Sequence, residues 1–575
     1  MLTLDTLSSE LLEEIFKIVN KLISEAALPF ACRDLTFEFD QSLAWAPQRD
    51  RQTDVEPYTQ SIDKLESLLR LSPGSPVWRG VRKVMVSSRF ARWPDEAHIF
   101  TRWDNQREAK FEPPFTPPEK SVQEKWGCFV QFLSRTINLK TVIFDCAERV
   151  PIILLEALEA YHPSCHLHVR NWTRIRADVC VGDPYEEALA RSPILRSLQA
   201  HFLYRVPAMD FNNVAFERIL ALAPNLEEIA YSRRFVGGCV VDNIDEEHKE
   251  KECKRFHVAQ PAKKTTIGRI KWGSLSPALL QSWGSFIDLQ KVKRLELDEV
   301  DDMEWAEYVM DHGTFSGLKH LLFKIDEYPR DTSQDNVKAT MERFLSSQPP
   351  LETLSIIQYQ GYVDLSFIFP HHGTSLRSLS LHQIEDTRGP RSVLSLDDLN
   401  LIHLEAPHLE HLELDVNRTQ NPQENEMQIY AILSSFLSLR TIAIHYDLGI
   451  HNECLNDSSV LRMAMRDPEQ ADTLRKDPKH WRPKLTPEIT EYKETYTRID
   501  EHFAKKVWQV VCNRRLEELV LYVGEPNQKI RLGYLAPWIM GEQEIRQCVR
   551  VCRNERDDLR EDVSALQISE ELRGY

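Results

Sequence analysis

This 575-residue chain has few glycines and lacks the glycine-containing motifs that several enzyme classes require. Only 19 residues are Gly, and the patterns G-x-x-x-x-G-K-[ST], G-x-G-x-x-G and G-x-S-x-G are all absent. The first two bind nucleotide phosphates through backbone N–H groups, and the third positions a nucleophilic serine. We therefore expect a protein that is not an enzyme and needs no cofactor. The alternative is an enzyme that uses an unrecognised Cys/His or carboxylate site.

The cysteines form neither a disulfide framework nor a zinc ribbon. There are 11 of them, an odd number, with no C-x-x-C pair. The densest set of metal-type side chains is His162, Cys165, His166 and His168, and no second half-site follows it at a zinc-type spacing. We expect no metal ion to bind there. Scattered cysteines of this kind are typical of a reducing compartment.

The chain also lacks long apolar runs and an excess of basic residues. No stretch reaches the roughly 18 apolar residues of a membrane span, and the first twenty residues carry acids where a signal peptide has a basic start. With 71 basic and 88 acidic residues, the net charge is -17, which disfavours a nucleic-acid partner. The sequence thus predicts an intracellular protein, cytoplasmic or nuclear or both, with neither a membrane nor a nucleic acid as its partner.

What the chain does contain is one short pattern, L-x-x-L-x-L, repeated at least eleven times. Clear copies begin at Leu351, Leu376, Leu409, Leu439 and Leu516, and looser copies begin at Val81, Leu139, Leu195, Leu226, Ile267, Val292 and Leu318. From Val292 to Leu439 the starts are 26, 33, 25, 33 and 30 residues apart. This spacing is close to the period of about 20 to 29 residues that is typical of leucine-rich repeats.

Amphipathic helices are predicted between the copies. Their spacing of apolar residues places them at 122–137, 152–161, 216–222, 337–345, 427–436 and 500–512. Strands that alternate with helices run parallel, because each crossover returns the chain to the same end of the sheet. One further copy is predicted at 164–169, where Leu167 and Val169 are apolar and His166 and His168 face away from the core. We expect an α/β fold, a leucine-rich-repeat solenoid of parallel strands alternating with helices.

The chain is too long for one globular core, and its patterns divide it into four parts. A short helical segment occupies 1–39, although Leu35, Phe37 and Phe39 alternate like a strand, and a linker occupies 40–80. The repeat array spans 81–537, with loop insertions near 242–255 and 467–498. In 538–575, apolar residues from Ile545 to Leu566 are spaced by three, four or seven, which predicts an amphipathic helix. We expect it to cap the last repeat; a coiled-coil contact is the alternative.

A row of polar residues follows from the same pattern. When the leucines face the core, the third, fifth and seventh positions of each copy face the opposite, concave side. Those residues are Arg294, Glu296, Asp298, His320, Lys324, Ser378, Ser380, His382, His411, Glu413, Asp415, Thr441, His445, Glu518 and Tyr522. Their mixture of charges, hydroxyls and imidazoles favours a protein or peptide substrate over an apolar ligand. The alternative for any single one is a solvated strand residue.

The N-terminal sequence LSSELLEEIF, residues 7–16, resembles the opening of an F-box, whose family pattern is L-P-x-E-[LI]-[LI]-x-x-[IL]-[FL]. With the downstream repeats, the chain resembles fungal-type F-box-like proteins with irregular leucine-rich repeats. In that family the F-box binds the Skp-type adaptor of a cullin-RING ubiquitin ligase, and the repeats select the protein substrate. The resemblance implies an adaptor contact, or its supporting core, at Leu7, Glu10, Leu11, Leu12, Ile15 and Phe16. Ser8 stands where the family has proline. The alternative is a capping helix on a repeat scaffold without a ubiquitin role.

Overall fold

The computed structural model describes two compact units. The first unit comprises Met1–Gly273 and Ala278–Leu289, and the second comprises Ser274–Pro277 and Gln290–Tyr575. The residues described are 34–39, 65–75, 77–88, 119–146, 149–172, 184–204, 212–235, 263–273, 275–300, 303–325, 334–385, 391–417, 425–447, 499, 501–513, 515–523, 547–553 and 563–567.

The first unit is built from strands that pair in chain order, every one parallel to the next. The strands are β1 (Asp34–Phe39), β2 (Lys83–Ser88), β3 (Thr141–Asp145), β4 (His166–Trp172), β5 (Leu195–Tyr204), β6 (Glu228–Phe235) and β7 (Arg269–Trp272). The helices are α3 (Val77–Gly80), α5 (Glu119–Arg135), α6 (Ile152–Tyr161), α7 (Pro184–Arg191), α8 (Asn212–Leu222) and α10 (Pro277–Trp283).

The second unit continues the same alternation and ends with two antiparallel strands. Its parallel strands are β8 (Arg294–Val300), β9 (His320–Ile325), β10 (Thr353–Ile357), β11 (Ser378–His382), β12 (His411–Val416), β13 (Thr441–Tyr446) and β14 (Glu518–Val523). The antiparallel strands are β15 (Gln547–Arg553) and β16 (Val563–Gln567). The helices are η5 (Leu289–Lys291, at the junction of the units), α11 (Glu304–His312), α12 (Gln334–Ser347), α13 (Leu365–His372), α14 (Leu396–Glu405), α15 (Asn425–Ser435) and α19 (Glu501–Val511).

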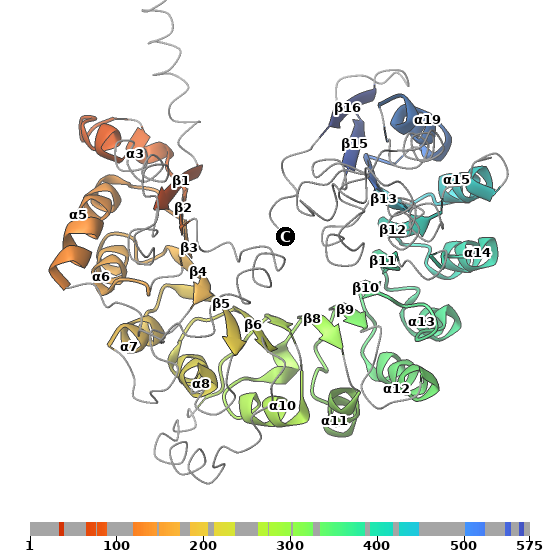
Figure 1. Ribbon diagram of the computed structural model, residues 1–575, viewed down its shortest axis with the longest axis horizontal. Helices are drawn as coiled ribbons and strands as arrows, with labels where there is room; N and C mark the ends of the chain where they lie inside the picture. The colour runs from red at the N-terminus through yellow and green to blue at the C-terminus, as the bar shows by residue number, and fades with distance from the viewer. Residues whose placement is uncertain are drawn as a thin grey trace, which may run out of the picture. The chain divides into compact units, whose positions relative to one another are not determined.

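The apolar positions of the repeated pattern form the core between strands and helices. In the copy at Leu351, the three apolar side chains Leu351, Leu354 and Ile356 are fully buried, while the residues between them are half-exposed. In the second unit, helices α11 to α15 lie along one face of the strands and cover these apolar residues (Figure 1). The predicted α/β alternation of parallel strands with helices is confirmed and fits a solenoid-like arrangement of repeats.

The predicted positions of individual elements also agree with the structure. Each of the six predicted helices overlaps an observed one: α5, α6, α8, α12, α15 and α19. The copy at 164–169 is confirmed as strand β4, in which Leu167 and Val169 are buried. Parallel strands begin earlier than predicted, because residues 34–39 form β1 beside β2. The segment 40–80 is not only a linker, since residues 65–69 and 77–80 are helical.

The C-terminal prediction was wrong. Residues 547–553 and 563–567 form strands rather than a capping helix. Val549 and Val551 are buried at a period of two, and branched residues of this kind favour a strand. β15 pairs with β14 and places Arg550 2.9 Å from Glu518. Backbone hydrogen bonds from β15 thus cover the edge of β14, which a helix would have left unpaired.

A buried histidine joins two neighbouring repeats of the second unit. His372 lies at the end of α13 and is fully buried. Its Nδ1 atom accepts a hydrogen bond from the Leu351 N–H at 3.2 Å, and its Nε2–H donates to the Leu345 carbonyl at 3.0 Å. Burial lowers the pKa of His372 to about 4, against a partial opposing effect of the Leu345 hydrogen bond. The imidazole is therefore neutral at physiological pH.

We expect His372 to make the second unit sensitive to acid. Because its pKa is below that of an unfolded histidine, the unfolded chain binds the proton more tightly, and stability is lost as the pH falls from 6.5 towards 4. The loss attributable to this residue is about 2 kcal/mol at pH 5. Urea midpoints measured at pH 7.5 and pH 5 test this. The shift should shrink in His372→Gln and persist in His312→Gln, an exposed control; equal shifts in both variants would contradict the assignment.

Candidate functional site

The polar face is the sheet face of the second unit that points away from helices α11 to α15. Parallel register aligns equivalent positions of successive strands on it into rows. One row contains Arg294, His320, Thr353, Ser378, His411, Thr441 and Glu518, and the next contains Glu296, Leu322, Ser355, Ser380, Glu413, Ala443 and Val520. A third contains Lys324, Ile357 and His382, then Asp415, His445 and Tyr522. A register shift after Leu297 takes Asp298 out of this row.

The structure brings six of the fifteen predicted substrate-binding residues together. Ser380, His382, Glu413, Asp415, His445 and Tyr522 form one network with Arg391, which we call the polar cluster. Four other predicted residues pair locally instead: Arg294 bonds Glu296 at 2.6 Å, His320 bonds Thr353 at 3.0 Å, and Glu518 pairs with Arg550 at 2.9 Å. The remaining five lie on their strands outside the polar cluster: Asp298, Lys324, Ser378, His411 and Thr441.

Asp415 is the centre of the polar cluster. Its Oδ1 atom accepts from His382 Nδ1–H at 2.7 Å and from the Arg391 guanidinium at 3.2 Å. Its Oδ2 atom accepts from the Gln383 backbone N–H at 2.5 Å. Burial alone would raise the pKa of Asp415, but Arg391 and His382 outweigh burial and hold it below the usual value. The carboxylate is therefore ionised and fully hydrogen-bonded.

Arg391 was missed by the sequence analysis because it lies in a loop before α14 and belongs to no strand. Its side chain is 1% exposed, as is that of Asp415. The guanidinium also donates to the His445 carbonyl at 2.7 Å and to the Val416 carbonyl at 3.4 Å. Asn417 donates to the Arg391 carbonyl in return. The ends of β12 and β13 are thus held together by one cation that the repeat pattern does not indicate.

Glu413 and His445 form the second acid–imidazole pair. His445 Nε2–H donates to Glu413 at 2.6 Å, and Ser380 also hydrogen-bonds this carboxylate. Burial opposes ionisation of Glu413, yet the hydrogen bond from His445 leaves its pKa lowered. Burial lowers the pKa of His445, and neighbouring His382 adds to the effect. Because both pKa values are lowered, Glu413 is an ionised carboxylate that accepts a hydrogen bond from the neutral imidazole of His445.

Ring stacking holds the imidazoles in place. The rings of His382 and His445 lie 4.4 Å apart, and that of Tyr522 lies 4.6 Å from His445 at an interplanar angle of 16°. Directly after β10, Gln358 has a left-handed φ of 63° and donates its N–H to the His382 carbonyl at 2.7 Å. The Glu413 side chain is 38% exposed. The polar cluster thus presents a carboxylate and an aromatic edge on a rigid support.

The hydrogen bonds of the polar cluster differ from those of a nucleophilic triad. In a triad the serine hydroxyl bonds an imidazole, whereas Ser380 bonds the Glu413 carboxylate. Among the described residues, no group of three or more His, Cys, Asp or Glu side chains is arranged to hold a metal ion. The arrangement is suited to hydrogen bonding and charge pairing with a bound molecule.

The histidine-rich sequence at 162–168 is used within the fold. His162 Nε2 lies 3.0 Å from the Thr136 hydroxyl and 2.9 Å from the Leu133 carbonyl. Cys165 is buried, and burial raises the pKa of its thiol to about 12. His166 and His168 alternate with the buried residues of β4, as predicted. His162 thus connects two neighbouring repeats, and the Cys165 thiol is held in its unreactive protonated form.

The comparisons with known proteins supply no family. No protein-family model matches the chain, and no curated protein matches it. None of the helices in the described part of the chain is both long and apolar enough to cross a membrane.

The predicted adaptor contact lies outside the described residues. This applies to Leu7, Glu10, Leu11, Leu12, Ile15 and Phe16, and equally to the predicted insertions at 242–255 and 467–498. The adaptor-binding role of these residues therefore stays a prediction. The substrate-binding role of the residues on the polar face also stays a prediction.

The buried ion pair of the polar cluster gives a testable stability effect. Asp415→Asn leaves the Arg391 cation buried without its counter-charge, and we expect it to lower the free energy of unfolding by about 3 kcal/mol. Replacing both partners, Asp415→Asn with Arg391→Met, should recover much of this loss. Glu517→Gln, which breaks an exposed pair with Arg440 at 3.4 Å, is the control and should cost less than about 1 kcal/mol. Equal losses from the buried and exposed changes, measured by urea unfolding, would contradict this assignment.

Proposed function

We propose that the chain is a non-catalytic protein-interaction module, a substrate receptor of a Skp-cullin-F-box ubiquitin ligase. Its leucine-rich-repeat array would bind a protein substrate on the polar face, and its F-box-like N-terminal segment would bind the Skp-type adaptor. The observation that carries the interaction role is the polar cluster, where residues from β11 to β14 meet on one sheet face. The ubiquitin role depends on the resemblance of residues 7–16 to an F-box.

The leucine-rich-repeat assignment is supported by the regular burial of the six-residue pattern. Leu376, Leu379 and Leu381, and the equivalent residues of the other clear copies, are at most 1% exposed. Asn417 lies three residues after the last apolar residue of its copy, where leucine-rich repeats carry asparagine or cysteine, and its copy is the one clear copy with such a residue there. Its side chain bonds Arg391. Repeats of this kind each contact mainly their neighbours and together offer an extended binding surface.

A protein partner fits the chemistry of the polar face. Glu413 is partly exposed and accepts hydrogen bonds, while Tyr522 is half-buried and stacked on His445. Aromatic side chains fixed in this way make effective anchors at protein interfaces, because little conformational freedom is lost on binding. We expect the partner to present a cation or N–H donors to Glu413.

A non-catalytic role is supported by the way the titratable groups are engaged. The ionised Asp415 carboxylate forms an ion pair with Arg391, His445 donates to Glu413, and burial raises the pKa of the Cys165 thiol. A general base needs a pKa near neutrality and reach to a substrate proton. Intracellular localisation, in the cytoplasm or nucleus, is part of the same proposal and depends on composition and on the F-box resemblance.

The adaptor role is tested by copurification with a Skp-type adaptor. We expect full-length protein to retain the adaptor and Leu11→Asp with Phe16→Asp to lose it, since acids on the apolar face of the predicted helix oppose burial in a groove. Ser9→Asp with Asn20→Asp adds the same charge at polar positions and should retain binding. A folded wild-type chain that never retains the adaptor would leave a repeat scaffold without a ubiquitin role.

The polar face is tested separately, in cells, by proximity labelling with the adaptor present. Glu413→Ala with Tyr522→Ala removes the acceptor and the aromatic edge, and we expect it to retain the adaptor while losing the proteins labelled by the wild type. Glu307→Ala removes an exposed carboxylate on α11, outside the polar face, and is the control. If the double variant labels the same proteins as the wild type, the substrate lies elsewhere.

A further inference from the structure

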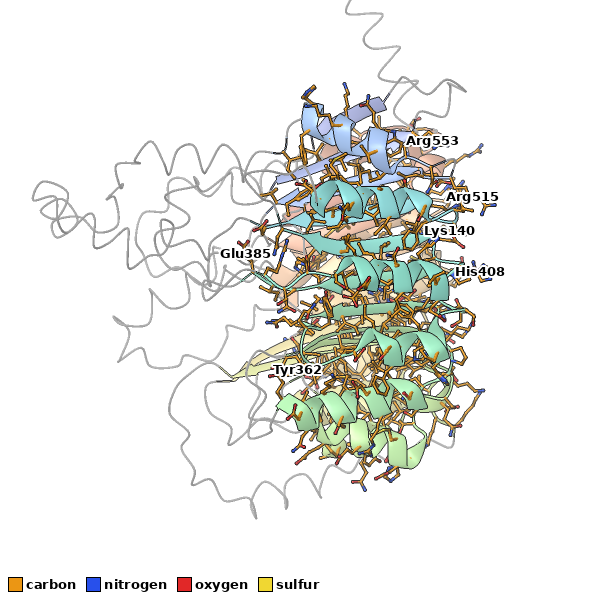
Figure 2. All side chains as sticks on the ribbon, turned by 90° about the vertical axis from the view of Figure 1, so that its right-hand side faces the viewer. Lys140, Tyr362, Glu385, His408, Arg515 and Arg553 are labelled. Atoms are coloured by element: carbon orange, nitrogen blue, oxygen red, sulfur yellow. The ribbon has the colours of Figure 1, made fainter. Side chains whose placement is uncertain are left out.

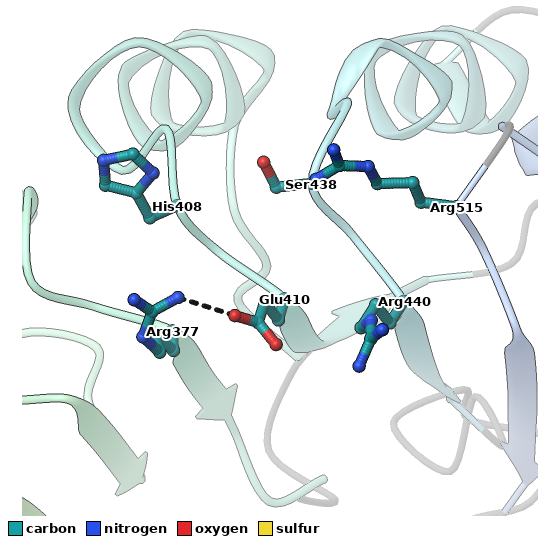
Figure 3. Close-up of a pocket in the computed structure, with 6 residues that line it drawn as sticks. All are labelled: Arg377, His408, Glu410, Ser438, Arg440 and Arg515. Carbon is teal, nitrogen blue, oxygen red and sulfur yellow. Dashed lines mark hydrogen bonds and ion pairs between the residues drawn. The ribbon is translucent and has the colours of Figure 1, made fainter.

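A second polar site lies where the strands of the second unit begin. Arg377, His408, Glu410, Ser438, Arg440 and Arg515 line a pocket of about 300 Å³ (Figure 3). They lie in the connections that lead into β11, β12, β13 and β14. In Figure 2, His408 and Arg515 lie at one edge of this unit, with Arg553, and Glu385 lies at the opposite edge. We call this pocket the rim pocket.

The rim pocket is cationic within an acidic chain. Three guanidiniums and one imidazole surround a single carboxylate, whereas the whole chain has a net charge of -17. Glu410 bonds Arg377 at 2.6 Å, and Arg440 pairs with Glu517 at 3.4 Å. Arg515 and His408 have no side-chain hydrogen-bond or ion-pair partner among the described residues, and both are exposed. The pocket therefore has more cations than its own carboxylates neutralise.

The excess of cations arises from two positions of the repeated pattern. The residue after the first leucine alternates in charge along the repeats: Lys319, Glu352, Arg377, Glu410, Arg440 and Glu517. Neighbouring residues in this series form ion pairs, as Lys319 does with Glu352. The residue before the first leucine adds His408, Ser438 and Arg515 with no acid. Figure 3 shows Arg515 extending towards Ser438, with Arg377 and Arg440 on either side of Glu410.

We propose that the rim pocket binds a phosphate group carried on a peptide segment of a partner protein. Guanidiniums match phosphate oxygens through paired N–H donors, and clusters of arginine are a recurrent means of recognising phosphorylated motifs. Arg515 is the principal donor, and Arg440 and Arg377 contribute once the phosphate competes with Glu517 and Glu410. The Ser438 hydroxyl already donates to the Pro407 carbonyl at 2.9 Å, so it is not counted among the donors to the phosphate.

A peptide fits this site better than a free anion or a nucleic acid. The side chains of Arg377 and Arg440 are 58% and 53% exposed, so the pocket is open and a bound group can continue into an attached chain. Leu437, directly before Ser438, is 77% exposed and offers an apolar contact to a flanking side chain. No Phe, Tyr or Trp lines the pocket to stack on bases, and the acidic chain repels a polyphosphate backbone.

Fluorescence anisotropy on the full-length chain, without the adaptor, tests this proposal. The probe is a labelled peptide library with one fixed phosphoserine and randomised flanks, and the comparison is its unphosphorylated counterpart. We expect phosphorylation to tighten binding, and Arg515→Glu to weaken it by about tenfold or more, since one charge-assisted contact is replaced by repulsion. Arg343→Glu, an exposed charge reversal on α12, is the control and should change binding less than about twofold.

Glu410→Gln is expected to tighten binding, which a misfolded protein would not do. It removes the one acid of the pocket and releases Arg377, so binding of the phosphorylated library should tighten by about threefold or more. Arg515→Lys, which keeps the charge but loses the paired donors, should weaken binding less than Arg515→Glu.

Several results would overturn the proposal. These are no preference for the phosphorylated library, inorganic phosphate binding as tightly as the peptide, or a short single-stranded oligonucleotide binding more tightly than either. Unchanged affinity in both Arg515→Glu and Glu410→Gln would also overturn it. Because the measurement involves neither the adaptor nor the polar face, its failure is distinct from failure of the proposed receptor role.

Discussion

Burial of three apolar side chains from each repeat is the constraint on which the second unit depends. A strand that buries Leu379 and Leu381 against a helix must send Ser378, Ser380 and His382 to the other face, because its side chains alternate. Parallel pairing in a fixed register then aligns these residues with their counterparts in the next repeat. The polar cluster and the rim pocket are consequences of this one register, expressed at the two ends of the same strands.

The two sites treat charge in opposite ways. In the polar cluster, Asp415 and Arg391 are almost completely withdrawn from water, so both must keep their partners, and the arrangement is rigid. In the rim pocket, the pair of Arg377 and Glu410 remains in contact with solvent. Such a pair contributes little to stability and exchanges partners at small cost. The first arrangement is suited to a preformed surface and the second to a ligand that competes with an internal acid.

The sequence predicted the strand positions well because period-two burial is a local property. Leu167 and Val169 identified a strand even where the leading leucine was missing, and the same alternation placed His382, Asp415 and His445 on one face. What the pattern could not give was their connection: His382 and Asp415 lie 33 residues apart, and their contact depends on the register of two strands. Arg391 comes from a loop with no periodicity. The C-terminal error has a similar origin, because Val549 and Cys552 satisfy a helical spacing while Val549 and Val551 satisfy that of a strand.

The alternating charges at the strand starts also constrain how many repeats this part of the array contains. Between Lys319 and Glu517 the sign reverses at every step, so each cation has an anion on the neighbouring repeat. Removing the single repeat that carries Glu410 would place Arg377 beside Arg440, whereas removing two adjacent repeats would restore opposite signs. The alternating charges therefore favour changes of repeat number in steps of two. Loss or duplication of two adjacent repeats preserves the pairing of opposite charges, and loss or duplication of one does not.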